Sequence, residues 1–382
     1  MEERKTNEQI KREETEKIER FKQEMLPFGQ LEEESKKEYV ERIRKELKGP
    51  KVHSVIIQKG GTGKTTSSSN LALSLSNMGF DVLLIDSDSQ ASLTVLVNEF
   101  DEDVIDQDVD SLEPIGLSKL YFQLINEEPI SDDLLKEVIT RPKYKKYETV
   151  RVTNPETGKR MLRRESTDIE FGFDFIAGDI SLADAEIFLA TSKDRNVGIA
   201  LTTIIQRILQ YKYYDFIIVD CAPGLSTLSY SAIAASSSGI IVPLNLEVMA
   251  IAGCRNLIGM TANIQTLLKD NFGIDHYGVL GIVINEYVPR LKYQRSLDET
   301  VKRFMPVERF IATIPSKSAC DSAHLMGRLY QQDSAEAKEA FDLLAKEVVE
   351  RDIANNYCEP SIIGINDLGR ESLKVMKEGE DE

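Results

Sequence analysis

A glycine-rich segment at residues 59–66, KGGTGKTT, constrains the fold more than any other feature of the chain. The β-branched run VHSVIIQ precedes it, and SSSNLALSLSNM, which has helical periodicity, follows it. A glycine-rich turn between a strand and a helix lets backbone N–H groups point inward, and the helix N-terminus adds the positive end of its dipole. The segment is therefore predicted to bind phosphate groups within an α/β fold.

The side chains of this phosphate loop have separate predicted roles. Lys64 is expected to reach the β- and γ-phosphates of ATP, the Thr65 hydroxyl to ligate Mg²⁺, and Thr66 to reach the α-phosphate. The ordinary pattern G-x-x-x-x-G-K-[ST] would need glycine where the chain has Gln58, so the match is to the deviant form K-G-G-x-G-K-[ST], whose first lysine is Lys59. The backbone expected to cradle the phosphates belongs to Gly60, Gly61, Thr62 and Gly63.

Three aspartates follow apolar runs elsewhere in the chain. Asp86 and Asp88 lie in VLLIDSDSQAS, and Asp220 lies in YDFIIVDCAPG, each at the carboxyl end of an expected strand, where open α/β sheets bind ligands. Asp220 and Asp86 are predicted at the metal, and Asp88 is predicted to orient the water that attacks the γ-phosphate. Each aspartate alone could simply end a strand or cap a helix, and their conjunction with the phosphate loop favours catalysis.

Continuous apolar runs alternate with helical stretches over most of the chain. This pattern predicts an α/β fold with a doubly wound, mostly parallel sheet and helices on both faces. The expected organisation is a helical extension at 1–50, one α/β domain at 51–351 and a tail at 352–382. The strand candidates after the phosphate loop are FDVLLIDSD (80–88), FGFDFIAG (171–178), YDFIIVDCAPG (214–224), GIIVPLN (239–245), GVLGIVIN (278–285) and RFIATIP (309–315).

Two regions depart from this alternation. In 1–50, apolar triplets at helical spacing on either side of Pro27 and Gly29 predict two amphipathic helices, which could serve dimerisation, dock a partner or pack on the body. An insertion at 101–170 contains the expected helix LSKLYFQLIN. Two β-favouring runs around the turn-forming NPETGK then predict a basic surface hairpin, which could contact DNA or dock a protein.

Composition limits the classes of function. The 382 residues carry a formal net charge of −17, so any nucleic-acid contact needs a local basic patch. The chain has no run of about 18 apolar residues, and its first twenty residues lack the apolar core of a secretory signal, which predicts a cytoplasmic protein. Its four cysteines are far apart and form no C-x-x-C pair, so neither a disulfide framework nor a zinc site is indicated.

The chain resembles the ParA family of partition ATPases, within the deviant Walker class that also includes MinD and the nitrogenase iron protein. The resemblance spans about 51–350 and rests on QKGGTGKTT, LLIDSDSQASLT, FIAGDISLADAE, YDFIIVDCAPG, GIVINEYVPR and TIPSKSA, in the family's order. It implies an ATP hydrolase, weak until a partner stimulates it, in which Lys59 reaches across an ATP-sandwich homodimer. Asp88 matches the hydrolysis position. Asn285 and the backbone near Pro315 match the region that holds adenine, although Asn285 could instead cap the next turn.

The resemblance also implies nonspecific binding to nucleoid DNA and a centromere-binding, ParB-like partner. Two departures weaken the DNA match, because Ser316 and Ala319 stand where the family often carries arginines; in addition, Ser89 replaces a usual proline. A basic helix after Arg290, which matches a DNA-contacting position, could equally be a solvated face. The candidate DNA residues are Arg290, Lys292, Arg295, Lys302, Arg303 and Lys317.

The leading hypothesis is an MgATP-dependent ATPase for plasmid or chromosome segregation. The 1–50 segment is too short for an operator-binding domain, so no specific operator recognition is expected. A MinD-like positioning ATPase on a membrane or protein scaffold is the alternative, but a membrane role needs a basic amphipathic C-terminal helix, and LGRESLKVMKEGEDE ends acidic. An iron–sulfur protein is disfavoured by the spacing of Cys221 and Cys254, and a metabolic ligase or kinase by the absence of a second-substrate motif.

Overall fold

A computed structural model of the chain describes residues 34–97, 116–153, 160–191, 198–305, 309–316, 320, 323 and 328–354. None of the helices in these ranges is long and apolar enough to cross a membrane. Of the four cysteines, Cys221 and Cys254 are buried and Cys320 is partly exposed, and none of these three forms a disulfide with another described residue.

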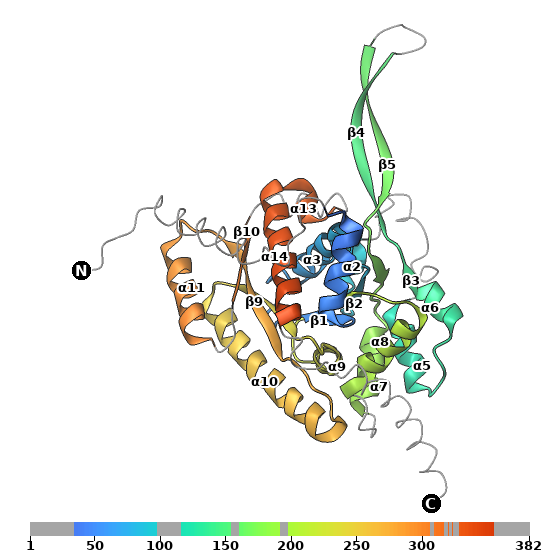
Figure 1. Cartoon of the computed structure of the whole chain (residues 1–382), viewed down its shortest axis with the longest axis vertical. Helices are drawn as coiled ribbons and strands as arrows, with labels where there is room; N and C mark the ends of the chain where they lie inside the picture. Colours follow the sequence, from blue (N-terminus) through green and yellow to red (C-terminus); the bar gives the residue numbers. More distant parts are fainter. Residues whose placement is uncertain are drawn as a thin grey trace, which may run out of the picture.

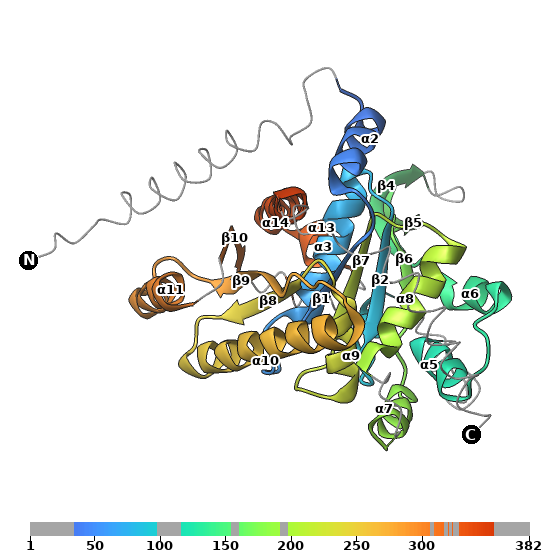
Figure 2. The same ribbon diagram turned by 60° about the horizontal axis from the view of Figure 1, so that its bottom comes forward.

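Eight of the described strands form a twisted sheet in the order β10-β9-β8-β1-β7-β2-β6-β3 (Figure 2). Neighbouring strands are parallel except that β3 runs antiparallel to β6. This confirms the predicted doubly wound, mostly parallel sheet, and each predicted strand is present. The strands are β1 (Lys51–Val55), β2 (Val82–Ser87), β3 (Ile139–Thr140), β6 (Asp174–Ile176), β7 (Phe216–Cys221), β8 (Ile240–Asn245), β9 (Val279–Tyr287) and β10 (Arg309–Pro315).

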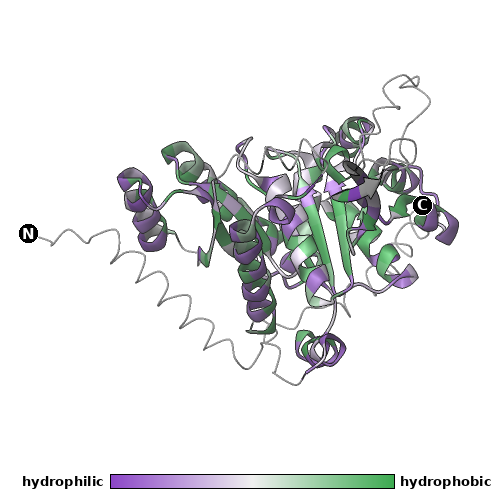
Figure 3. Ribbon diagram, turned by 90° about the horizontal axis from the view of Figure 1, so that it is seen from above, coloured by the Kyte–Doolittle hydropathy of each residue, from purple (hydrophilic) through white to green (hydrophobic). Residues whose placement is uncertain are grey.

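Helices cover both faces of the sheet because alternate strand residues point to opposite sides. In β2, Leu83 and Ile85 join one apolar cluster, whereas Val82 and Leu84 join the other. Figure 3 shows the central strands mainly in green, whereas the helices around them carry many hydrophilic residues, drawn in purple. One face packs against α2 (Lys36–Leu47), α3 (Lys64–Met78), α4 (Ser92–Val97), α13 (Tyr330–Asp333) and α14 (Ala335–Ala354). The other packs against α5 (Leu117–Ile125), α6 (Asp132–Val138), α7 (Leu182–Thr191), α8 (Ala200–Tyr211), α9 (Thr227–Ala235), α10 (Val248–Phe272) and α11 (Lys292–Phe304).

Helix α2 is the second of the two helices predicted before the phosphate loop, and it packs on the body. Ser35 and Glu38 form a capping box at its start, and its apolar triplet Val40, Ile43 and Leu47 is buried. Arg44 joins it to the sheet by bonding Asp215 and Asp81 at 2.6 Å each. The first predicted helix, with Ile18, Phe21 and Met25, lies outside the described residues.

The predicted basic hairpin is present as β4 (Lys143–Thr153) and β5 (Arg160–Glu170). The two strands pair antiparallel from Lys143↔Glu170 to Thr153↔Arg160. Figure 1 shows this ribbon projecting well beyond the other described elements. It leaves the body between β3 and β6, at the edge where β6 begins.

Candidate functional site

The phosphate loop connects the end of β1 to the start of α3, at the carboxyl edge of the sheet. Gly61 and Gly63 have φ angles of 69° and 77°, which side chains other than glycine seldom adopt. A Cβ atom on Gly63 would lie 2.6 Å from Nδ2 of Asn285. Backbone conformation and space together therefore require glycine at position 63.

Asn285, near the carboxyl end of β9, supports this loop. Its Nδ2 donates to the Thr62 carbonyl at 2.7 Å and to Ser67 Oγ at 3.0 Å. Its Oδ1 is buried and has no hydrogen-bond partner within the described part of the chain. The side chain thus braces the loop and keeps one acceptor unused, while its contact with adenine stays a prediction.

The two lysines of the loop have different surroundings. Lys64, which begins α3, is 8% exposed, and burial lowers its pKa even though Asp220 and Asp88 act in the opposite direction. The side chain of Lys59 is 40% exposed and pairs with Glu247, the residue directly before α10. Lys64 therefore lies inside the site, whereas Lys59 extends across its surface.

Asp220 ends β7 beside the phosphate loop. Thr65 Oγ1 donates to Asp220 Oδ2 at 2.8 Å, and Asp220 Oδ1 is buried with no hydrogen-bond partner among the residues described. Burial, followed by repulsion from Asp86 on the adjacent strand, raises the pKa of Asp220 to about 7. A buried carboxylate with one unused oxygen beside a threonine hydroxyl suits Mg²⁺, which commonly uses one or two protein ligands together with waters and phosphates.

Asp86 accepts hydrogen bonds from the turn and the helix that follow β2. Its oxygens accept Thr94 N at 2.9 Å, Thr94 Oγ1 at 2.8 Å and Asp88 N at 3.1 Å, and burial raises its pKa to about 6. A Cβ on Gly178 would lie 2.8 Å from Asp86 Cγ, so only glycine leaves room here for the Asp86 carboxylate. Asp86 thus fixes the turn that carries Asp88, and its role at a metal stays a prediction.

Asp88 is partly exposed and lies in the turn between β2 and α4. Its Oδ1 accepts the backbone N–H of Gln90 at 2.9 Å. Its charge acts on Lys64, so the carboxylate lies on the same side of the sheet as the phosphate loop. The structure therefore gathers Lys59, Lys64 and Asp88 at one edge, as the motif spacing predicted, while their catalytic roles stay predictions.

A family model described as an AAA domain, AAA_31, matches residues 50–274. The chain belongs to the AAA_31 family. It is 26% identical over 303 residues to the sporulation initiation inhibitor protein Soj of Bacillus subtilis. This alignment covers 78% of this chain and 98% of Soj. It is 25% identical over 309 residues to the chromosome partitioning protein ParA of Caulobacter vibrioides, covering 79% and 95% of the two chains. Together with the loop, these matches define a P-loop ATPase of the ParA/MinD class.

The fold of this AAA_31 protein also has solved counterparts. The ATP complex of a Cyanothece McdA variant superposes with a TM-score of 0.57 at 18% identity, covering 79% of this chain and 97% of McdA. At that identity the likeness establishes the fold alone. It agrees with the parallel sheet and with the position of the phosphate loop at its carboxyl edge.

The remaining predicted residues of this ParA/MinD-class ATPase lie in α3, in β10, and in or just before α11. Thr66 is in the first turn of α3, and Pro315 ends β10, where its carbonyl accepts the Tyr330 hydroxyl at 3.2 Å. The basic residues of α11 lie beyond β9 and β10, at one end of the sheet (Figure 2).

These basic residues are not equivalent. Arg290 and Lys292 are exposed, and Arg295 is partly exposed. Lys302 pairs with Asp298 at 2.8 Å and with Glu299 at 2.9 Å. Arg303 is exposed on the same helix, and Lys317 lies outside the described residues.

Sequence reasoning missed three residues of the site. Glu247 lies 188 residues from Lys59, and nothing local in NLEVMA indicates their contact. Thr94 and Gly178, which hold Asp86, do lie in the segments LLIDSDSQASLT and FIAGDISLADAE that carried the family resemblance. Those segments could therefore have indicated a buried aspartate with a threonine donor.

Proposed function

We propose that this protein is an MgATP-dependent DNA partition ATPase that works as an ATP-sandwich homodimer. The ATP-bound dimer binds nucleoid DNA nonspecifically, and a centromere-binding, ParB-like partner stimulates hydrolysis so that the dimer opens and releases DNA. The similarity to a sporulation initiation inhibitor protein, Soj, and to a chromosome partitioning protein, ParA, supports this class of role.

The described residues fit ATP and Mg²⁺. Lys64 and the loop backbone would hold the phosphates, and Thr65 with Asp220 would hold the cation, whose chemistry is to neutralise charge on the β- and γ-phosphate oxygens. Asp88 would orient the attacking water. Its partial exposure leaves room for that water, whereas the engaged oxygens of Asp86 suit a supporting role.

The observation that carries the dimer proposal is the position of Lys59. This lysine extends away from its own loop to Glu247, although a second lysine, Lys64, already lies inside the loop. Directly after Glu247, Val248 and Met249 are 69% and 76% exposed. Apolar side chains of this size beside a nucleotide site suit burial against a second subunit. A lysine already directed outward at that surface is placed to reach the partner's phosphates.

The DNA-binding surface of the proposed dimer includes α11. Lys292 begins this helix and Arg290 lies two residues before it. Both are exposed and neither forms an ion pair among the described residues, whereas Lys302 pairs with two carboxylates. Contacts with phosphates are sequence-independent and weaken with salt, so this surface would bind nucleoid DNA without an operator.

The test is to measure mass in solution and DNA retention at low salt with ADP, with ATP, and with ATP on an Asp88→Ala variant. We expect monomers with ADP, and dimers that retain DNA with ATP. The Asp88→Ala variant should stay dimeric and DNA-bound because it cannot complete hydrolysis. A monomer under all three conditions would refute the sandwich mechanism, and a dimer without DNA retention would refute the DNA role. Sedimentation with lipid vesicles instead of DNA would favour the MinD-like alternative.

A further inference from the structure

The ribbon formed by β4 and β5 is rooted at the edge of the sheet opposite the phosphate loop. Thr140 of β3 pairs with Phe175 of β6, so the ribbon starts and ends beside the amino end of a parallel strand. The phosphate loop lies at the carboxyl ends of those strands. A ligand on the ribbon would therefore be bound away from the nucleotide.

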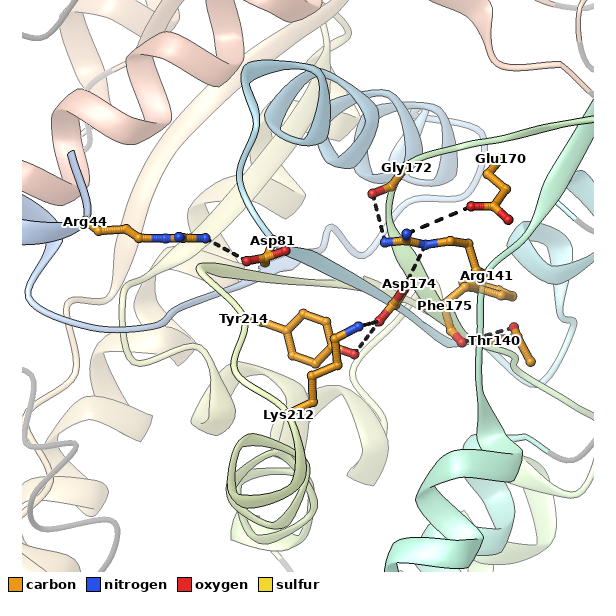
Figure 4. A network of polar contacts seen from close by, with 10 residues as sticks. All are labelled: Arg44, Asp81, Thr140, Arg141, Glu170, Gly172, Asp174, Phe175, Lys212 and Tyr214. Atoms are coloured by element: carbon orange, nitrogen blue, oxygen red, sulfur yellow. Dashed lines mark hydrogen bonds and ion pairs between the residues drawn. The ribbon is translucent and has the colours of Figure 1, made fainter. Parts of the chain in front are cut away.

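A polar network holds the root of the ribbon in place (Figure 4). Asp174, whose side chain is 7% exposed, accepts the Tyr214 hydroxyl at 2.7 Å and Arg141 Nε at 3.2 Å. Lys212 pairs with the same carboxylate. Arg141 lies two residues before the ribbon, so the network joins the base of the ribbon to the segment between α8 and β7.

Aromatic packing adds to this anchorage. The ring of Tyr144 lies 4.9 Å from that of Phe171, which in turn stacks on Phe173 at 5.4 Å. The backbone N–H of Phe171 donates to the Pro142 carbonyl at 3.1 Å. A two-stranded ribbon has little stability by itself. These contacts allow the body to support a ribbon that projects into solvent.

Charge is distributed unevenly along the ribbon. Near the root, Lys143 lies opposite Glu170 and Lys145 lies opposite Asp168, so basic residues face acidic ones across the strands. The distal segments 149–153 and 160–164 hold four arginines and no acidic residue. Each of these arginines lies opposite an uncharged residue in the pairing register. They are Arg151 (opposite Leu162), Arg160 (Thr153), Arg163 (Val150) and Arg164 (Thr149).

Three of the four arginines share one face of the ribbon. Directly opposite residues in an antiparallel pair lie on the same face, and so do residues two apart. By this rule Arg164, Arg151 and Arg160 occupy successive positions on one face, about 7 Å apart along the strands. The pattern is a row of arginine positions on a protein whose net charge is −17.

We propose that the distal half of this ribbon binds duplex DNA through its phosphates. Arginine matches phosphate geometry with two parallel hydrogen bonds, and a ribbon that projects from the body can lie along the backbone of a duplex. A site of this kind takes DNA of any sequence, because contacts with phosphates carry no sequence information. This inference rests on the proposed function for its choice of DNA as the partner.

The position of the root adds a second part to the inference. Because the ribbon is rooted opposite the nucleotide site, each subunit keeps its DNA contact with either ADP or ATP. A dimer presents two ribbons and gains avidity, which it loses when it separates. Release after hydrolysis then follows from splitting the pair of ribbons and does not require either ribbon to change.

The experiment uses the full chain with ADP and a duplex of random sequence, with affinity measured by fluorescence anisotropy at several salt concentrations. The test variant combines Arg151→Gln, Arg160→Gln and Arg164→Gln. The matched control combines Lys143→Gln, Lys145→Gln and Lys146→Gln, which removes the same charge at the root. A third variant, with the three arginines changed to lysine, keeps the charge. It separates lost contacts from misfolding.

Loss of three phosphate contacts should lower the slope of log affinity against log salt by about 3. Between 50 and 200 mM salt, the affinity of the wild-type protein should therefore fall roughly 40-fold more than that of the test variant. The root control and the arginine-to-lysine variant should both keep a slope near that of the wild-type protein.

Equal slopes for the wild-type protein and the test variant would overturn the inference, as would an equal loss in the root control. Unchanged DNA binding together with lost binding of a ParB-like partner would assign the ribbon to a protein, and would also overturn it. If the wild-type protein binds no DNA with either nucleotide, the proposed function itself fails. If it binds DNA and only the ribbon variants are without effect, the ribbon inference alone fails.

Discussion

Replacing Asp220 with asparagine is expected to stabilise the nucleotide-free protein at alkaline pH and to abolish its binding of MgATP. The Asp220 carboxylate is buried beside Asp86, and one of its oxygens has no partner among the described residues. Asparagine keeps an oxygen that can accept from Thr65 but carries no charge. The change therefore removes the cost of burying an anion together with the charge that a cation needs.

The magnitude follows from the shifted pKa. The pKa of Asp220 is about 7 in the folded protein, against an ordinary value of 3.8, so the folded state holds the proton more tightly than the unfolded state. Its contribution to stability is present below pH 3.8 and is lost as the pH rises to about 7. The whole loss is on the order of 4 kcal/mol, of which about 1 kcal/mol falls between pH 6 and pH 8.

Urea unfolding of the nucleotide-free protein at pH 6 and pH 8 measures this difference. The free energy of unfolding of the wild-type protein should fall by about 1 kcal/mol more than that of Asp220→Asn between these two pH values. Asp133→Asn changes an exposed aspartate in α6 and should parallel the wild-type protein. Parallel curves for wild type and Asp220→Asn would refute the account of a buried, proton-binding carboxylate.

Two further substitutions test the contacts around the site and the N-terminal helix. Glu247→Gln frees Lys59 from a half-exposed ion pair that is worth up to about 1 kcal/mol. The variant should therefore form dimers, detected by light scattering, at an ATP concentration up to about fivefold lower than the wild-type protein needs. A higher ATP requirement would contradict this view of the pair. Arg44→Ala removes two bonds to the buried Asp215 and should lower the free energy of unfolding by about 2 kcal/mol. Lys338→Ala, which breaks an exposed helical pair, should cost under about 1 kcal/mol, and equal losses would contradict the role of α2.

The sheet and the phosphate loop could be predicted from the sequence because each depends on a pattern within a short segment of the chain. Continuous apolar runs such as that of β7 identify strands buried on both faces. The spacing of glycines and lysines in 59–66 identifies the loop, and Gly63 has the left-handed φ angle that this spacing requires. The hairpin was also predictable, since NPETGK separates two β-favouring runs.

Contacts between distant segments could not be predicted in this way. His53 in β1 lies 2.8 Å from Asp352 in α14 and 2.8 Å from the Gly239 carbonyl, although nothing in the sequence of β1 indicates a buried contact with a carboxylate. Strand β3 has two residues, too few for any periodicity. The Lys59–Glu247 pair likewise depends on how β8 is placed beside β1.

The most direct test of the central claim is the mass in solution of Lys59→Ala with ATP, measured by analytical ultracentrifugation beside Asp88→Ala and the wild-type protein. The account predicts that Lys59→Ala binds ATP about as well as the wild-type protein, because Lys64 serves its own loop, but stays monomeric. Asp88→Ala should be dimeric under the same conditions. A Lys59→Ala protein that dimerises with ATP like the wild-type protein would contradict the claim that Lys59 acts across a dimer.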